Sequence, residues 1–314
     1  MKRLSMRWRT WARAWVVLLV AASIACPAVA ADDLIVGFTG MGDYAPIFVA
    51  KQQGMFKAQG IDPSLKMMSQ VASAVASNSA QIGGVTPTVL LQAIDSGLDL
   101  VVIAGGSQTT HADRSFGVVV RTGREIRQPK DFEGKTVGVQ AIGAFLQVTF
   151  RKWLQDKGVD SSKVHFVEVK IPQMNDVLKG GSVDAVVVPN PFMQRIVDSG
   201  NGFVGAYYSA DLPEGMPAMV YVSTRAWAAS HRKEVAAFRA ALAQGIAFTQ
   251  SRPDATRADI GEFIKVPAAV LAKIQWAQLN AQITPAQLGM WNSILTDQHL
   301  LRAPIDVSKL FFTP

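Results

Sequence analysis

The stretch Gln81-Ile-Gly-Gly-Val-Thr-Pro-Thr-Val-Leu-Leu-Gln-Ala-Ile-Asp95 indicates how this chain folds. Its first residues form a short apolar run that is typical of a buried strand, and the later residues have apolar side chains at helical spacing. Thr86 is a good N-cap residue, and Pro87 then occupies the first helical position. We therefore predict a strand over 81–84 that is followed at once by a helix over 87–95.

The same change from strand to helix is expected in three further loops, at 39–46, 140–145 and 189–192. Asn190 and Pro191 repeat the pattern of N-cap residue and proline, and Pro46 can play the same part after Asp43 or Tyr44. Each of these could also be an ordinary turn, such as every α/β protein contains. Their recurrence instead favours a set of related ligand loops.

Strands and helices alternate along most of the chain. Strands are predicted at 34–38, 64–68, 81–84, 100–104, 117–121, 136–140, 164–169, 183–188 and 218–223. Helices are predicted at 46–53, 71–77, 87–95, 145–157 and 174–179, with mainly helical structure from His231 onward. Strands separated by helices of this length predict an α/β fold with mostly parallel sheets that helices cover on both faces.

In an open parallel sheet, ligands bind at the carboxyl ends of the strands, where the helix starts offer free N–H groups. The four loops contain no Lys or Arg, whereas the connection 105–114 adds Arg114, which could also be a solvated loop residue. We expect a small organic ligand with an apolar body. The candidate ligand-binding residues are Met41, Gly42, Asp43, Tyr44, Thr86, Pro87, Gly106, Ser107, Gln108, His111, Gly143, Ala144, Phe145, Asn190, Pro191, Phe192 and Met216.

The charge of the chain is concentrated at its N-terminus. The 314 residues have a formal net charge of +7, from 31 Lys and Arg against 24 Asp and Glu. Five of the basic residues and none of the acidic ones lie in the first thirty positions, so the remainder is nearly neutral. A near-neutral body argues against nucleic-acid binding, which needs a basic surface on the folded domain.

Residues 1–30 have the pattern of a cleavable signal peptide. Basic residues end at Arg13, the apolar run 15–25 follows, and Ala28-Val-Ala30 forms a small-residue cleavage site. The apolar run is too short to span a bilayer, although an uncleaved anchor or lipidation of Cys26 is an alternative. Cleavage after Ala30 leaves no cysteine, which excludes disulfides and thiolate catalysis from the mature chain.

The sequence gives little support to an enzyme. The four histidines are scattered without metal-ligand spacing, and there is no Walker loop and no nucleophile elbow. Gly40-x-Gly42-x-x-Ala45 imitates a dinucleotide fingerprint, but Pro46 follows directly and no acidic residue ends the next strand. We therefore expect no metal and no cofactor.

Five blocks of sequence, in a fixed order, carry a resemblance to a known family. They are 45–61, with Gly54-Met-Phe56; 81–87; Asp131-Phe-Glu-Gly-Lys-Thr-Val137; Leu178-Lys-Gly-Gly-Ser-Val-Asp-Ala185 with Asn190-Pro-Phe192; and 300–307. In these blocks the chain resembles the periplasmic solute-binding proteins of ABC importers, in the family that binds sulfonates, nitrate, taurine and thiamine precursors.

The resemblance implies a two-lobed type II periplasmic binding protein fold with the ligand cleft between the lobes. It places lobe 1 at 32–115 plus 221–314 and lobe 2 at 116–220. It further implies a periplasmic monomer whose partners are a small-molecule ligand and the membrane permease of an ABC importer.

Two departures from the family affect the ligand. Pro189-Asn190 stands where the family has glutamate or tryptophan before its Pro-Phe pair, and Ala141-Ile-Gly-Ala144 replaces a loop richer in glycine and hydroxyl groups. Both remove polar groups, so an aromatic or heterocyclic ligand, including a carboxylate, is favoured over sulfonate or nitrate. The alternative function is an enzyme of thiamine-precursor or related metabolism on the same fold.

Overall fold

The structure is a computed structural model that describes residues 34–39, 42–261, 263 and 277–313. The predicted signal peptide, Cys26 and the candidate residue Met41 lie outside these ranges. Within them, no helix is both long enough and apolar enough to cross a bilayer.

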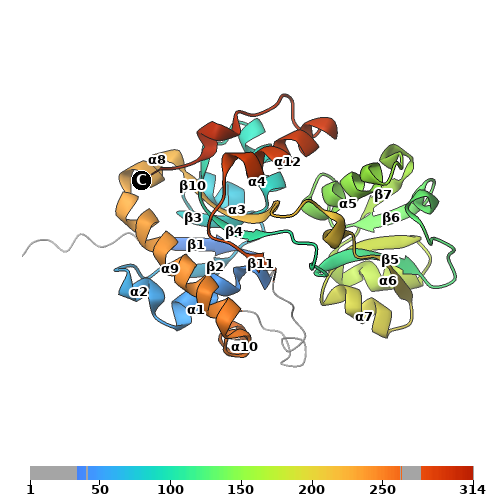
Figure 1. The fold of residues 1–314 in the computed structure, drawn as a ribbon, viewed down its shortest axis with the longest axis horizontal. Coiled ribbons are helices and arrows are strands. Elements are labelled where there is room, and N and C mark those ends of the chain that lie inside the picture. The colour runs from blue at the N-terminus through green and yellow to red at the C-terminus, as the bar shows by residue number, and fades with distance from the viewer. Residues whose placement is uncertain (1–33, 40–41, 262, 264–276, 314) are drawn as a thin grey trace, which may run out of the picture. The chain divides into compact units, whose positions relative to one another are not determined.

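The described residues form two separate β-sheets (Figure 1). The six-stranded sheet has the order β11 (Gln278–Leu279), β4 (Leu100–Gln108), β10 (Pro217–Thr224), β3 (Ile82–Val85), β1 (Ile35–Phe38), β2 (Ser64–Met67). The five-stranded sheet has the order β7 (His165–Glu168), β6 (Thr136–Val139), β8 (Ala185–Pro189), β5 (Phe116–Arg121), β9 (Gly202–Ala206).

Most strands of each sheet run in the same direction, as expected from the sequence, but both sheets are mixed because each also contains antiparallel strands. In the first sheet β1 is parallel to β2 and β3, but β10 is antiparallel to β3 and β4. In the second sheet β6 is parallel to β7 and β8, but β5 is antiparallel to β8 and β9. The antiparallel direction of β5 and β10 follows from the chain's path, because β5 is the first strand after the chain crosses to the second sheet and β10 is the first strand after it crosses back. Each therefore starts at the edge where its neighbours end.

The helices flank these sheets. Those that accompany the first sheet are α1 (Ala45–Gln52), α2 (Met55–Ala58), α3 (Val71–Ala76), α4 (Pro87–Asp95), α8 (Arg225–Ser230), α9 (Arg232–Ser251), α10 (Pro253–Gly261) and α12 (Pro285–Asp297). Those that accompany the second are α5 (Phe145–Asp156), α6 (Met174–Lys179) and α7 (Phe192–Asp198). The predicted helices over 87–95 and 174–179 are confirmed with the same bounds.

Strand β4 is longer than predicted and extends through Gly106, Ser107 and Gln108, which the sequence analysis placed in a loop. The glycines caused this error, because here they mark a close approach of two backbones rather than a turn. A Cβ on Gly105 would lie 2.5 Å from the Asn280 carbonyl oxygen, next to the short strand β11 that was not predicted.

The predicted end of lobe 2 at residue 220 falls inside β10. This strand pairs with β4 from Pro217 onward, so its first residues belong to the first sheet. Leu146 and Val148 of α5 share one apolar cluster with Leu288 and Trp291 of α12. The main core therefore continues from one lobe into the other.

Candidate ligand-binding site

Two crossing segments, 109–115 and 207–216, connect the sheets (Figure 1). Strand β4 runs in the direction of β1 and β3, because β10 is antiparallel to both β3 and β4. The carboxyl ends of β1, β3 and β4 therefore share the edge from which segment 109–115 leaves. By the same reasoning the carboxyl ends of β6 and β8 share the edge at which β5 begins. The crossing segments thus join the two edges at which open α/β sheets generally bind ligands.

At the first of these edges, Asp43 is held by Ser107. The Ser107 hydroxyl, which is buried on β4, donates a hydrogen bond of 2.6 Å to Asp43 Oδ2. Burial raises the pKa of the Asp43 carboxyl, the bond from Ser107 opposes this shift, and the nearby charge of Asp113 adds to it. Two predicted residues from distant parts of the sequence are therefore brought into direct contact.

Tyr44 lies in the core beside this pair rather than at an open surface. Its hydroxyl donates to the Gly84 carbonyl oxygen at 2.7 Å, and burial raises the pKa of the phenol to about 12. The ring lies against Gly84, where an added Cβ would be 2.2 Å from Tyr44 Cε1. This contact explains why a glycine occupies the position before the last residue of β3.

Tyr221 is a polar residue of this region that the sequence analysis missed. It lies on β10 with its ring centroid 6.5 Å from that of Tyr44, and its buried hydroxyl has no hydrogen-bond partner. Burial raises its pKa well above the ordinary value, with further contributions from Tyr44 and Asp43. Its position within an apolar strand gave no sign that its hydroxyl would lie near Asp43.

Thr86 begins α4 as predicted. Its hydroxyl oxygen accepts a bond from the Val89 N–H at 3.4 Å and lies 2.9 Å from the Thr88 hydroxyl oxygen. Pro87 occupies one of the first two helical positions and is buried. The predicted N-cap at this position is confirmed, so the Thr86 oxygen is already engaged by its own helix.

The predicted N-cap at Asn190 is wrong. Helix α7 begins at Phe192, and Pro191 precedes it without a capping side chain. Asn190 instead contacts the first crossing segment: its N–H donates to the Ser115 carbonyl at 2.7 Å, and its Nδ2 donates to the Arg114 carbonyl at 3.0 Å. This leaves Oδ1 of Asn190 buried without a partner.

The loop before α5 approaches the first lobe. Gly143, which has a φ of 76° in the left-handed region, accepts a hydrogen bond of 2.8 Å from Gln92 of α4 through its carbonyl. The N–H groups of Ile142 and Gly143 are bonded to Glu168 Oε1 at 2.9 Å and to Gln147 Oε1 at 3.0 Å. Two donors that a ligand oxyanion could have used are therefore occupied by the chain itself.

A groove of about 380 Å³ lies between this loop and the helices α3 and α4. Among its lining residues, Val89 and Ile142 are exposed apolar side chains at 41% and 57%. The predicted residues Gly143 and Ala144 also line it. The groove therefore includes part of the predicted second-lobe site.

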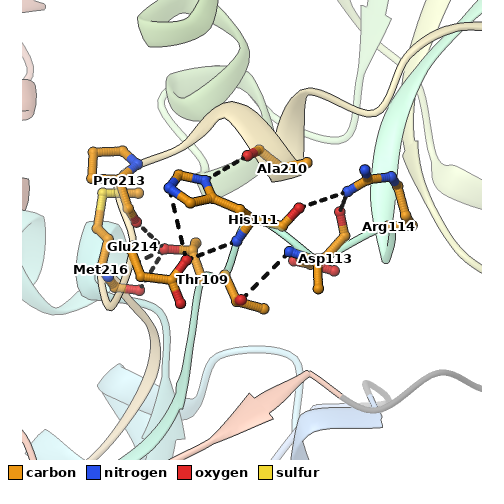
Figure 2. A network of polar contacts seen from close by, with 10 residues as sticks. Thr109, His111, Asp113, Arg114, Ala210, Pro213, Glu214 and Met216 are labelled. Atoms are coloured by element: carbon orange, nitrogen blue, oxygen red, sulfur yellow. Dashed lines mark hydrogen bonds and ion pairs between the residues drawn. The ribbon is translucent and has the colours of Figure 1, made fainter.

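His111 and Met216 belong to a network that joins the two crossing segments (Figure 2). The His111 N–H donates to Glu214 Oε2 at 2.8 Å, and its Nδ1 lies 2.9 Å from the Ala210 carbonyl, which requires the proton on Nδ1. Met216 accepts from the Thr109 N–H at 2.8 Å through its carbonyl and donates to the Thr109 hydroxyl at 3.1 Å. These residues therefore hold the crossing segments together.

The remaining candidates Gln108, Phe192 and Gly106, and the neighbouring Arg114, have partners within the protein. Gln108 Oε1 accepts from Asn280 Nδ2 at 3.1 Å, and the Arg195 guanidinium lies 5.3 Å from the Phe192 ring centroid. Arg114 donates to the His111 and Asp113 carbonyls. Gly106 lies in β4, where an added Cβ would be 2.5 Å from Met219 Cε.

The structure brings together the first-lobe candidates Asp43, Tyr44 and Ser107. Gly42 begins the 3-10 turn Gly42–Tyr44 that carries the first two. Across the ranges that the structure describes, we find no hydrogen bond or ring contact between this group and Asn190 or Phe192. Their joint role in binding therefore stays a prediction. The described residues also contain no group of three or more His, Cys, Asp or Glu side chains placed to hold a metal.

Residues 42–256 match the family model described as NMT1/THI5 like. Since this is more than half of the chain, the protein belongs to that family. The two lobes and their flanked mixed sheets are those of the periplasmic binding protein fold.

Solved structures support this fold. The aliphatic sulphonate binding protein SsuA from Escherichia coli is 15% identical, with a TM-score of 0.74 over 89% of this chain and 97% of that one. The nitrate-binding protein NrtA from Synechocystis PCC 6803 is 13% identical, with a TM-score of 0.69 over 88% and 84%.

Curated relatives are also distant. The nitrate/nitrite binding protein NrtA from Synechococcus elongatus is 24% identical over 54% of this chain and 44% of its own length. The nitrate import ATP-binding protein NrtC from Synechocystis is 22% identical over 76% of this chain and 38% of its own length. The chain thus spans less than half the length of these relatives.

Proposed function

We propose that this protein is an exported solute-binding protein that captures a small organic molecule between its two lobes and delivers it to the permease of an ABC importer. One observation carries the proposal: segments 109–115 and 207–216 join the sheets at the edges where their parallel strands end. Closure about such a hinge lets one ligand contact loops from both lobes, so that binding stabilises the closed state.

The ligand that we propose is an aromatic molecule, a heterocyclic molecule, or an organic acid or sulfonate. Partly buried Phe145 and Phe192 begin the helices α5 and α7 and supply apolar surface. Asp43, Ser107 and Asn190 supply the polar contacts at the two edges. The relatives whose names mention sulphonate and nitrate support a small solute of this size range.

We further propose the division expected from the sequence, lobe 1 at 32–115 plus 221–314 and lobe 2 at 116–220, with the second boundary moved to the start of β10 at Pro217. We also propose that the monomer works in the periplasm after removal of residues 1–30. The proposed permease partner is supported by the name of the relative NrtC, a nitrate import ATP-binding protein. It is also supported by a second relative, the bicarbonate transport ATP-binding protein CmpC from Synechocystis.

A thermal-shift screen of the purified protein tests the proposal. The panel contains sulfonates, aromatic carboxylates, pyrimidines and nitriles, and a ligand at one hundred times its Kd stabilises the folded state by about 2.7 kcal/mol. We expect one class to raise the Tm while NMR shows the compound unchanged after long incubation. Conversion of the stabilising compound would contradict a binding protein and favour an enzyme.

A further inference from the structure

Three hydroxyl donors at the first-lobe edge are already used within the protein. Ser107 donates to Asp43, Tyr44 donates to the Gly84 carbonyl, and Thr39 Oγ1 donates to the Tyr44 hydroxyl at 3.4 Å. An oxyanion needs several such donors aimed at it. A negatively charged ligand that used these three donors would therefore have to displace internal hydrogen bonds.

The charge at this edge is negative. Asp43 feels the charge of Asp113 in the first crossing segment, whose own Oδ1 accepts from the Ser115 N–H at 2.7 Å. In the described part of the chain, no Lys or Arg forms an ion pair with either carboxylate. The nearby Arg114 directs its guanidinium to the His111 and Asp113 carbonyls and lies over the Tyr207 ring. A partly buried carboxylate without a cation is costly, and a cationic ligand would reduce that cost.

Two further atoms are left without partners near the ends of these strands. The Tyr221 hydroxyl, on a fully buried side chain beside Tyr44 and Asp43, makes no hydrogen bond, and neither does Asn190 Oδ1 at the end of β8. A carbonyl oxygen can only accept, and a hydroxyl can accept as well as donate. Asn190 Oδ1 therefore requires a partner that donates a hydrogen bond, and the Tyr221 hydroxyl can accept one as well.

From these contacts we infer that the ligand of the proposed site is a small organic ammonium ion, whose charged N–H groups bond to Asp43. The inference rests on the proposed capture of a small organic molecule, and it replaces the organic acids and sulfonates of the proposed ligand class with amines. It makes Asp43 the residue that selects the sign of the ligand charge. Ser107 acts as a positioning residue, because its hydroxyl holds the carboxylate in place.

Isothermal titration calorimetry with the purified protein tests this inference by measuring the affinity for each probe. The probes are primary amines with aliphatic and aromatic bodies, each paired with the sulfonate and the alcohol of the same carbon skeleton. We expect at least one amine to bind more tightly than both of its counterparts. Asp43→Asn should lower the affinity for that amine by at least about tenfold, as expected for the loss of a hydrogen bond to a charged group. It should strengthen binding of the matched sulfonate.

The control variant is Asp297→Asn, which removes the same charge from an exposed position at the end of α12 and should leave the amine affinity unchanged. Tighter binding of a sulfonate or alcohol than of every amine would overturn the inference and leave the proposed function standing. An equal loss of affinity for the amine and the sulfonate in Asp43→Asn would also overturn the inference, because it would indicate that Asp43 has a purely structural role. If no compound of any class binds, the proposed function itself is wrong.

Discussion

The ring of Phe145, the first residue of α5, packs against Trp291 of α12 with their centroids 5.2 Å apart. Trp291 is fully buried, and its indole N–H donates to the Pro217 carbonyl at 2.6 Å, where β10 begins. The start of a second-lobe helix is thereby attached to the first lobe and to the end of a crossing segment. Phe145 is consequently a contact between lobes as well as a candidate ligand residue.

Replacing Phe145 by Ala should destabilise the protein. The substitution removes ring contacts to Trp291 and to Phe116, whose centroid is 5.5 Å away. Because Phe145 is only partly buried, we expect a loss of about 2 kcal/mol, below the range for a fully buried phenylalanine. Urea unfolding measures the loss. The matched control is Phe203→Ala, a residue 37% exposed on β9, and equal losses in the two variants would contradict a bridging role.

Much of the fold could be predicted from local sequence. The strand and helix around Thr86 were found because the apolar run, the capping hydroxyl and the proline all act within a few residues. The direction of β10 could not be found in this way, since it depends on how the chain crosses between sheets. The extension of β4 was missed because Gly105 looks like a loop residue until the backbone of Asn280 is seen against it.

The site was predicted less completely than the fold. Asp43 and Ser107 were both candidates, but the bond between them joins residues 64 positions apart, and no local pattern encodes it. Tyr221 was not a candidate, because a tyrosine within an apolar strand looks like a core residue. Asn190 was expected to cap α7, whereas tertiary contacts with the first crossing segment determine where its side chain points.

Gly84→Ala should be destabilising although alanine suits a strand better than glycine. The new Cβ would lie 2.2 Å from Tyr44 Cε1, and the Tyr44 ring cannot move freely because its hydroxyl is bonded to the Gly84 carbonyl. Overpacking of this kind costs about 1–3 kcal/mol. Thermal unfolding should show a lower Tm.

Gly289→Ala provides the opposite control. Apart from the backbone of its own helix and its chain neighbours, no described atom lies within 4 Å of the added Cβ at this position in α12. Alanine should therefore stabilise the helix by up to about 1 kcal/mol. A Gly84→Ala protein as stable as the wild type would show that the Tyr44 ring can shift without cost.

Thr109→Val should weaken the connection between the crossing segments. The buried Thr109 hydroxyl donates to the Pro213 carbonyl and accepts from the Met216 N–H at 3.1 Å, and valine keeps the shape but makes neither bond (Figure 2). Leaving such groups unpaired costs about 1–3 kcal/mol. The free energy of urea unfolding should fall by this amount. Thr110→Val, at a neighbouring position where the hydroxyl accepts only a 3.4 Å bond from the Ala112 N–H, should change it by less than about 0.5 kcal/mol.

Asp43→Asn should make stability less dependent on pH. Burial raises the pKa of Asp43 in the folded state above its ordinary value of 3.8, so the native state holds this proton more tightly than the unfolded chain. The stabilising contribution of the protonated carboxyl is complete below pH 3.8 and is lost as the pH rises through the folded-state pKa. Asparagine can still accept the Ser107 bond but never becomes charged. The variant should therefore exceed the wild type in unfolding free energy at pH 7, and this difference should shrink as the pH falls toward 4. Urea titrations at both pH values measure it, and a variant less stable than the wild type at pH 7 would show that the carboxylate is compensated in the folded state.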